Sequence, residues 1–407
     1  MTSTDERTIV VVGGGLAGAK AVEALREQGF DGSLVLLAAE DRLPYERPPL
    51  SKEYLQTGEG LDDTTVHPRE WYDEQRIDLR LGQRATGFDP AARTVATSAG
   101  EHLAYDVLLL ATGAQPRTLD LPGADLDGVL TLRTVADSDR LRAAFTEDAR
   151  VVVVGGGWIG LETAAAARTA GASVTVLESL ELPLLRVLGP RMATMFAQLH
   201  REHGVDLRTE TEVEGFENDG SVTGVRLRSG EVLAADVVVV GVGAAPDVEL
   251  AEAAGLRIDN GVVTDAHGQT SDAHVYAVGD VAQYPDALSG KDIRVEHWAN
   301  ALNHPAAVAS GMLGKDATYD DLPYFFTDQY DLGMEYVGLG KASDDVVVRG
   351  DLDKRELIAF WVRDGRVRAG MNVNVWDVVD DVKALIRSEK PVDLQRLADP
   401  DGPLTSV

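Results

Sequence analysis

The stretch TIVVVGGGLAGAKAVEAL, residues 8–25, decides the fold. A run of β-branched residues ends in glycines, and apolar residues then recur at helical spacing over residues 16–28. A second apolar run follows at residues 33–39. Strand, glycine turn, helix and strand in this order predict a βαβ unit of the kind that binds dinucleotides.

The glycines of this turn have the spacing G-x-G-x-x-G, at Gly13, Gly15 and Gly18. They permit a tight turn, a close approach of the backbone to a pyrophosphate, and close packing of the helix on the strand. The unpaired N–H groups of the helix N-terminus then face the phosphates. An acid about 20 residues further on completes the fingerprint. Glu40 is the acid nearest to that place, and the alternative for it is a carboxylate that faces solvent.

The same pattern returns at residues 151–177, where GGGWIG follows a strand and opens a helix. Its glycines are Gly155, Gly157 and Gly160, and Glu178 ends the next strand. A carboxylate there can accept both ribose hydroxyls of NAD and would repel a 2′-phosphate, so NADH is favoured over NADPH. Arg186 is the residue that could instead accommodate such a phosphate. Two dinucleotide sites imply a tightly held flavin and a transient nicotinamide that exchange electrons.

The rest of the chain completes this organisation. Buried-looking strands at residues 105–110, 235–240 and 274–278 end in ATG, GVG and GD. After Pro323, short alternating segments predict an antiparallel sheet, followed by a helix at residues 378–386. We expect three domains: an FAD-binding domain at 1–113 and 243–320, an NAD-binding domain at 114–242, and a small C-terminal domain at 321–407.

The composition excludes several classes of protein. The 407 residues include no cysteine, which excludes disulfides, thiolate nucleophiles, cysteine-ligated iron–sulfur clusters and zinc–thiolate sites. The eight histidines lack metal-ligand spacing, so no metal is expected. A net charge of −29 disfavours nucleic acid and anionic membranes as partners. No apolar run is long enough to span a bilayer, and MTSTDERTIV lacks the features of a secretory signal. We therefore expect a cytoplasmic protein.

Several motifs together point to one family. They are PYERPPLSK (44–52), LLATGA (109–114), GGGWIGLE (155–162), AVGD (277–280) and DQYDLG (328–333). With them, nearly the whole chain resembles the FAD-dependent NADH:ferredoxin reductases of the putidaredoxin, rhodocoxin and biphenyl dioxygenase reductase type. The resemblance implies an α/β, glutathione-reductase-like fold with two Rossmann-type dinucleotide-binding domains and a small α+β C-terminal domain. It also implies FAD and NADH as cofactors.

The wider superfamily often carries a redox-active cysteine pair where this chain has prolines and Arg47. Without thiols there is no dithiol relay, so the flavin must pass electrons directly to an external acceptor. We expect the prolines to hold the chain extended and Ser51 to cap a helix, which fixes Lys52. The resemblance implies that Lys52 lies near the flavin N5 and pairs with Glu162. The alternatives are a surface lysine and an exposed helix acid.

The resemblance implies further contacts with both cofactors. Glu40 departs from the family pattern, since relatives usually place the ribose-binding acid at the position of Ala39. Core or surface roles are open alternatives for Arg133, Trp298 and Phe326, and a helix cap is an additional role for Asp280. His297 is expected to be structural. The FAD contacts implied are Gly13, Gly15, Ala17, Gly18, Glu40, Arg47, Lys52, Thr112, Gly113, Arg133, Asp280, Trp298 and Phe326. The NAD contacts implied are Gly155, Gly157, Ile159, Gly160, Glu162, Glu178, Arg186 and Gly243.

The predicted function is an NADH-dependent flavoprotein reductase that passes electrons one at a time to a 2Fe–2S ferredoxin, which feeds a haem or Rieske oxygenase. We expect it to act as a monomer. A rubredoxin reductase would share the motifs and differ in its docking surface, and an NADH:quinone reductase would need an apolar slot by the flavin. A binding protein of the apoptosis-inducing-factor type would need basic patches, against which the net charge argues. Candidate cations for an acidic ferredoxin are Arg47, Arg186, Arg191 and Arg294.

Overall fold

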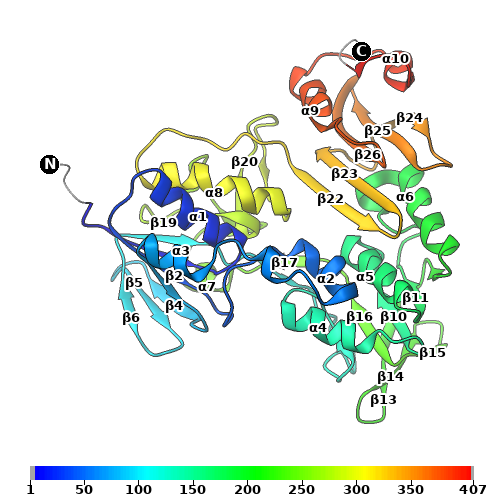
Figure 1. Cartoon of the computed structure of the whole chain (residues 1–407), viewed down its shortest axis with the longest axis horizontal. Coiled ribbons are helices and arrows are strands. Elements are labelled where there is room, and N and C mark those ends of the chain that lie inside the picture. The colour runs from blue at the N-terminus through cyan, green and yellow to red at the C-terminus, as the bar shows by residue number, and fades with distance from the viewer. Residues whose placement is uncertain (1–4, 405–407) are drawn as a thin grey trace. The chain divides into compact units, whose positions relative to one another are not determined.

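The structure is a computed structural model that describes residues 5–404 (Figure 1). The first four residues of the segment MTSTDERTIV and the last three residues of the chain lie outside the described part. The chain forms two compact units, which we describe separately. Within the described part, the first unit contains residues 5–46, 62–115 and 245–323, and the second contains residues 47–61, 116–244 and 324–404.

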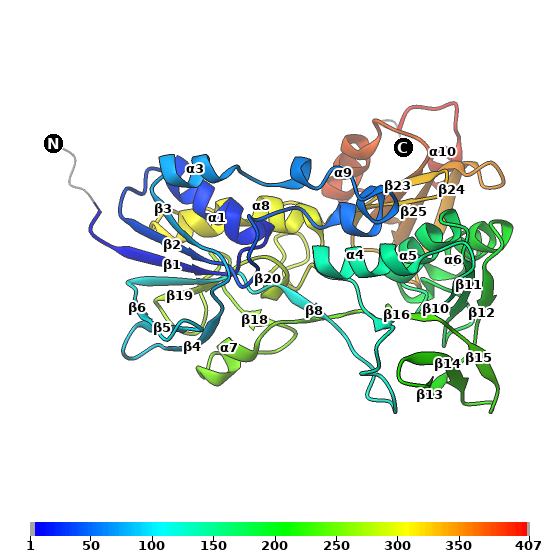
Figure 2. The same ribbon diagram turned by 60° about the horizontal axis from the view of Figure 1, so that its bottom comes forward.

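The first unit is built on a five-stranded parallel sheet in the order β19-β7-β1-β2-β3. Alternate residues of β1 point to opposite faces. Ile9 and Val11 pack with the core formed by the helices α1 (Leu16–Glu27) and α8 (Trp298–Met312), which lie side by side in Figure 2. Val10 and Val12 pack with the core on the other face. Burial on both faces explains why the opening run is apolar at every position. The strands are β1 (Thr8–Val12), β2 (Ser33–Leu37), β3 (Ile77–Arg80), β7 (Val107–Leu110) and β19 (Val275–Ala277).

Smaller elements complete the first unit. Its helices are α1 (Leu16–Glu27), η2 (Asp62–Thr64), α3 (Arg69–Glu74), α7 (Glu249–Ala253), η3 (Gly279–Val281) and α8 (Trp298–Met312). Its antiparallel sheet contains β4 (Ala85–Asp89), β5 (Thr94–Thr97) and β6 (His102–Ala104), and a further sheet contains β18 (Val262–Val263), β20 (Ala282–Pro285) and β21 (Asp292–Ile293). The strands β8 (Ala114–Pro116) and β17 (Ala244–Pro246) pair with each other in a two-stranded sheet.

The second unit repeats the parallel arrangement, in the order β12-β11-β10-β16-β9. Its parallel strands are β9 (Val129–Leu130), β10 (Arg150–Val154), β11 (Ser173–Leu177), β12 (Asp206–Arg208) and β16 (Val237–Val240). Its antiparallel strands are β13 (Val213–Asn218), β14 (Val222–Leu227) and β15 (Val232–Ala234). Its helices here are η1 (Pro48–Ser51), α2 (Glu53–Thr57), α4 (Val135–Ala144), α5 (Trp158–Thr169) and α6 (Leu185–Glu202).

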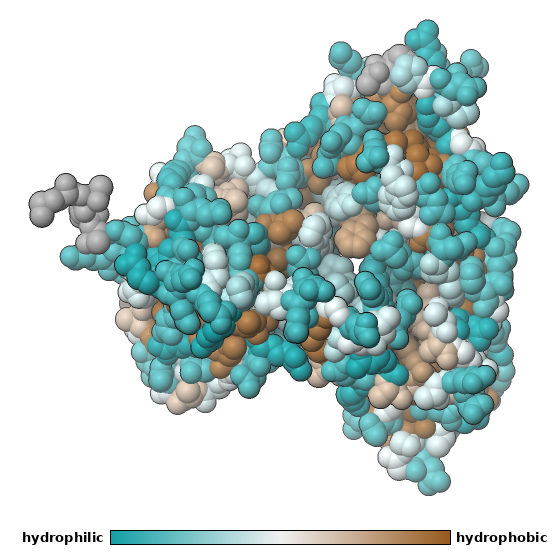
Figure 3. All heavy atoms as spheres, viewed as in Figure 1, coloured by the Kyte–Doolittle hydropathy of each residue, from teal (hydrophilic) through white to brown (hydrophobic). Residues whose placement is uncertain are grey.

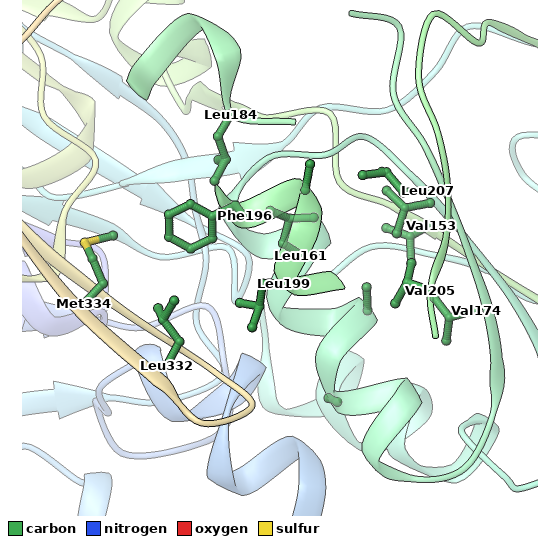
Figure 4. Close-up of a cluster of buried hydrophobic side chains, with 14 of the residues drawn as sticks. Val153, Leu161, Val174, Leu184, Phe196, Leu199, Val205, Leu207, Leu332 and Met334 are labelled. Carbon is green, nitrogen blue, oxygen red and sulfur yellow. The ribbon is translucent and has the colours of Figure 1, made fainter. Parts of the chain in front are cut away.

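The C-terminal segment forms a five-stranded antiparallel sheet within the second unit, in the order β22-β23-β26-β25-β24. One buried cluster joins it to the parallel sheet and its helices. Leu332 and Met334 of β23 belong to the same core as Phe196 and Leu199 of α6 (Figure 4). The elements are β22 (Tyr324–Gln329), β23 (Leu332–Gly338), β24 (Asp345–Asp351), β25 (Glu356–Arg363), β26 (Arg366–Val373), α9 (Val379–Ser388) and α10 (Leu394–Ala398).

The predicted fold class is confirmed: two parallel Rossmann sheets and a C-terminal antiparallel sheet are present. The division into three functional domains stays a prediction. Its boundaries place residues 47–61 in the FAD-binding domain, whereas Arg47–Leu61 belongs to the second unit. The reason is packing on α4, where the Tyr54 hydroxyl donates to Asp139 at 2.7 Å and Ser138 donates to the Leu50 carbonyl at 2.8 Å.

The surface agrees with the composition. The face in Figure 3 is mainly hydrophilic, as a chain with 67 acidic and 38 basic residues requires. Within residues 5–404, no helix combines the length and the apolar content that crossing a membrane demands.

Candidate functional site

The first glycine turn forms a cradle at the N-terminus of α1. Gly13 has a φ of +125°, and a Cβ on it would lie 2.1 Å from the Ala111 carbonyl oxygen. A Cβ on Gly18 would lie 1.9 Å from the Gly13 carbonyl oxygen. Both positions therefore require glycine. Apart from Gly15 itself and its two neighbours in the chain, no heavy atom lies within 4 Å of the place where a Gly15 Cβ would stand, so the backbone there is open to a pyrophosphate.

Residues distant in sequence gather beside this cradle. A Cβ on Gly279 would lie 2.8 Å from the Ala17 Cβ, so the AVGD turn packs against the first turn of α1. Asp280 is thereby placed near the cradle. The guanidinium of Arg294 donates to the Asp280 carbonyl at 3.1 Å and pairs with Glu296. The predicted FAD contacts Ala17 and Asp280 are thus brought close together within the first unit. The additional role of Asp280 as a helix cap is wrong, because Asp280 lies inside η3, which begins after Val278 without a side-chain cap.

The other predicted FAD contacts of the first unit have specific partners. Thr112 donates to the Asp247 carbonyl at 2.7 Å, and Gly113 accepts from the Asp247 N–H at 2.9 Å. The indole of Trp298, the first residue of α8, donates to Glu46 at 2.9 Å. Trp298 therefore lies in the first turn of a 15-residue helix, in contact with the PYERPPLSK segment.

Glu40 is partly buried and accepts from the Tyr45 hydroxyl at 2.7 Å. The Tyr45 hydroxyl therefore holds this carboxylate, and its role toward a ribose and the solvent-facing alternative both stay predictions. Ala39, where relatives usually have the acid, is exposed.

Two predicted FAD contacts lie in the second unit. The Arg47 guanidinium donates to the Arg133 carbonyl, and the Arg133 N–H donates to Asp137 at 3.1 Å. Asp137 also completes a capping box with Thr134 at the start of α4. The turn that carries Arg133 is therefore held rigidly, and Arg47 is anchored to it rather than extended into solvent.

The second glycine turn repeats the cradle at the N-terminus of α5. Gly155 has a φ of +106°, and a Cβ on it would lie 2.4 Å from the Gly241 carbonyl oxygen. A Cβ on Gly160 would lie 2.1 Å from the Gly155 carbonyl oxygen, whereas one on Gly157 would meet nothing closer than 3.7 Å. The pattern of required and open positions is the one seen in the first cradle.

Glu178 lies beside this second cradle. Its carboxylate accepts from the Gly156 N–H at 2.9 Å and from the Leu180 N–H at 2.8 Å, which holds it at the end of β11. Ile159, 43 % exposed in the first turn of α5, leaves an apolar surface next to the turn. Arg186 is exposed at the start of α6, and Gly243 accepts from the Arg117 N–H at 2.9 Å with a φ of +104°.

The Lys52–Glu162 pair is the most enclosed charged group of the second unit's predicted site. The Lys52 ammonium donates to Glu162 Oε1 at 2.9 Å, and their side chains are 14 % and 3 % exposed. The same ammonium lies 5.3 Å from the ring centroid of Phe326. Burial raises the pKa of the adjacent Asp328, an effect that Lys52 opposes and Glu162 reinforces. The alternatives of a surface lysine and an exposed helix acid are therefore wrong.

Two local predictions around this pair are also wrong. Pro48 and Pro49 lie in a 3₁₀ turn rather than an extended segment, because Pro at the first helical positions is compatible with helical φ. Ser51 does not cap α2. Its hydroxyl bonds to Glu162 Oε2 instead, since the buried carboxylate is the stronger acceptor.

Sequence reasoning missed other residues at Glu162. The hydroxyl of Thr327 donates to Glu162 Oε1 at 2.5 Å, and Gln329 donates to Thr327 at 3.1 Å. The sequence did contain a signal for these residues. Side chains alternate between the two faces of a strand, so Thr327 and Gln329 of β22 lie on the same face. Among the described residues no group of acids and histidines is arranged to hold a metal ion.

Comparison with known proteins identifies relatives along the whole chain. Residues 7–304 match the family model described as pyridine nucleotide-disulphide oxidoreductase, and residues 324–407 match the model described as reductase C-terminal. The chain is 39 % identical to the 5,5'-dehydrodivanillate O-demethylase ferredoxin reductase subunit of Sphingobium sp., over 98 % of this chain and 97 % of the relative. It is 37 % identical to rhodocoxin reductase of Rhodococcus erythropolis, over 97 % of this chain and 92 % of the relative.

A solved structure extends the likeness to three dimensions. The covalent putidaredoxin reductase–putidaredoxin complex contains a chain that is 37 % identical and superposes with a TM-score of 0.94, covering 98 % of this chain and 97 % of that one.

Proposed function

Because the chain belongs to the pyridine nucleotide-disulphide oxidoreductase family, and within it to the ferredoxin reductases with a reductase C-terminal domain, we propose that it oxidises NADH and reduces a 2Fe–2S ferredoxin that feeds an oxygenase. The single observation that carries the proposal is the enclosed Lys52–Glu162 pair in a chain without cysteine. Electrons cannot leave through a dithiol, so the acceptor must take them directly from a cofactor.

The two cradles match the two cofactors of this reaction. The residues around Gly13, Gly15 and Gly18 would hold FAD, and those around Gly155, Gly157 and Gly160 would hold the nicotinamide dinucleotide. When bound, FAD supplies the exchange between a two-electron donor and a one-electron acceptor. The protein supplies orientation and charge. The required glycines and the open side of each turn support this assignment.

The preference for NADH rests on Glu178. Its backbone partners hold the carboxylate in place at the end of β11, where it would accept hydrogen bonds from the ribose hydroxyls. A 2′-phosphate at the same place would meet a negative charge that these two hydrogen bonds hold in place. We propose that Arg186, exposed in α6, is too weakly held to reverse this preference.

The Lys52–Glu162 pair is proposed to orient the nicotinamide and the flavin ring edge. The Glu162 carboxylate would accept from the nicotinamide amide, and the Lys52 ammonium would donate to the flavin. Each charge needs the other, because an unpaired charge with so little exposure is costly. The proposed FAD contacts Ala17, Thr112, Arg133, Trp298 and Phe326 would hold the remaining parts of the cofactor.

The proposal that the partner is a ferredoxin rests on similarity to known ferredoxin reductases. The superposed reductase was solved in a complex with putidaredoxin, and several relatives are ferredoxin reductase components of dioxygenases. A small acidic ferredoxin would need local cations on this acidic surface. Of the four candidates, Arg186 and Arg191 are exposed, whereas Arg47 is held by the Arg133 carbonyl and Arg294 pairs with Glu296 with its side chain 8 % exposed. We propose that the enzyme acts in the cytoplasm, as a monomer.

Anaerobic titration tests the first half of the reaction. NADH is expected to bleach the flavin absorbance of the FAD-loaded protein stoichiometrically, and NADPH much more slowly. The second half is tested by cytochrome c reduction with and without added 2Fe–2S ferredoxin, which should be strictly ferredoxin-dependent. Efficient quinone reduction without any ferredoxin dependence would make the protein a quinone reductase instead.

A further inference from the structure

Glu162 lies at one end of a line of buried polar side chains that leads away from Lys52. Thr327 Oγ1 lies 2.5 Å from Glu162 Oε1, and Gln329 Nε2 lies 3.1 Å from Thr327 Oγ1. His200 Nε2, on α6, lies 2.9 Å from Gln329 Oε1. Thr327, Gln329 and His200 are 0 %, 1 % and 0 % exposed. Apolar residues at these positions would fill the space without the cost of burying polar groups, so packing alone does not account for the line.

The chemistry of the groups decides the direction of each hydrogen bond. An ionised carboxylate only accepts, so the Thr327 hydroxyl donates its proton to Glu162. That hydroxyl oxygen then accepts from the Gln329 amide nitrogen, and the Gln329 oxygen accepts from His200 Nε2. His200 Nδ1 is therefore an acceptor, and the Tyr330 hydroxyl faces it at 3.4 Å.

Every donor in this line points toward Glu162. Hydrogen bonds aligned head to tail polarise one another, and the effect is larger where water is excluded. Burial lowers the pKa of His200 to about 4, so its ring is neutral near pH 7, as the direction of the line requires. The aligned donors stabilise the charge on Glu162 and hold the carboxylate in one orientation toward Lys52.

We propose that Thr327, Gln329 and His200 are positioning residues for NADH oxidation, acting through Glu162. The inference rests on the proposed function, in which Glu162 orients the nicotinamide. The neighbouring Asp328 is a second acid that interacts electrostatically with Lys52, and burial raises its pKa. The donors directed at Glu162 stabilise the negative charge on its carboxylate. Lys52 therefore pairs with Glu162 rather than with Asp328.

The test separates the two halves of the catalytic cycle in the FAD-loaded enzyme. Thr327→Val removes the donor to Glu162 and keeps the shape of the side chain, whereas Thr327→Ser keeps the donor. We expect the rate of flavin bleaching by saturating NADH to fall about tenfold in Thr327→Val, the size expected for a lost hydrogen bond to a charged group. It should recover to within about twofold of wild type in Thr327→Ser. The rate at which dithionite-reduced enzyme passes electrons to ferredoxin and cytochrome c should be unchanged in both.

A second variant guards against failure to fold. The double substitution of His200→Phe with Gln329→Met removes both partners of one buried bond together, which is better tolerated than removing one. It should slow only the NADH-dependent half of the cycle. His304→Asn is the control, since His304 is 2 % exposed and lies in the first unit, in α8. It should leave both half-reactions unchanged.

The outcomes are distinct. Bleaching of Thr327→Val at the wild-type rate, or equal slowing of Thr327→Val and Thr327→Ser, overturns the inference. If wild-type enzyme is itself not bleached by NADH, the proposed function fails instead.

Discussion

Breaking the Lys52–Glu162 pair should cost much of the rate of NADH oxidation. Glu162→Gln keeps the volume and the two hydroxyl partners, Ser51 and Thr327, but removes the negative charge 2.9 Å from the Lys52 ammonium. Lys52→Met removes the opposite charge. With 3 % and 14 % exposure, the pair is shielded from solvent, so the coupling should lie near the upper part of the range for contacting residues, about 2 kcal/mol. That corresponds to roughly a 30-fold loss of rate for either substitution.

The assay is anaerobic stopped-flow bleaching of the flavin by saturating NADH in FAD-loaded protein. Because the two charges act as a unit, the double variant should be no slower than the slower single variant. Asp127→Asn provides the control, since Asp127 pairs with Arg140 on the surface, where such a pair contributes about 0–1 kcal/mol. It should change the rate less than twofold. Multiplicative losses in the double variant would refute the reasoning, since they would mean that the two residues act independently.

Three further predictions follow from the same structure. Glu178→Ala should raise the KM for NADH more than the KM for NADPH in steady-state assays, and equal increases would argue against its ribose role. Gly18→Ala should abolish folding, because its Cβ would lie 1.9 Å from a carbonyl oxygen. Gly15→Ala should fold normally, as judged by circular dichroism, but lose FAD on gel filtration. Retention of FAD by Gly15→Ala would contradict the open cradle. Burial lowers the pKa of His200 to about 4 and of His304 to about 3, so the unfolded chain binds these protons at higher pH. The free energy of unfolding should therefore be highest above pH ~6.5 and should fall by about 2 kcal/mol per histidine as the pH is lowered to 5. In urea unfolding of FAD-loaded protein, the midpoint urea concentration should differ less between pH 7 and pH 5 in His304→Asn than in wild type. An unchanged difference would mean that the buried histidine is not the cause of the loss of stability.

Local patterns accounted for the architecture. Each cradle is a continuous run in which strand, glycine turn and helix follow one another, so glycine spacing and apolar periodicity were sufficient to predict both parallel sheets. The structure adds the steric reason, since a Cβ on Gly13 or Gly155 would overlap a carbonyl of a neighbouring strand's turn. The antiparallel sheet β13–β15 was not predicted, because its strands are short and their alternation is broken by bulges.

The environment of the charged pair was only partly predictable. Family resemblance indicated Lys52 and Glu162, but Ser51 was interpreted as a helix cap, the role that serine commonly has at such a position. Its actual partner, Glu162, lies 111 positions along the chain, and Thr327 lies 165 positions beyond Glu162. The capping preference of serine depends only on neighbouring residues, so it cannot predict an acceptor that is so distant in sequence.

The sequence by itself determined the class of fold, the two dinucleotide cradles and the absence of a sulfur relay, because these depend on spacing within short segments and on which residue types are present. Only the tertiary structure decided how enclosed the Lys52–Glu162 pair is and that Thr327, Gln329 and His200 extend from it. Those contacts arise where β22 and α6 pack in one core with α5. Water is excluded there, so these polar side chains must form hydrogen bonds with one another.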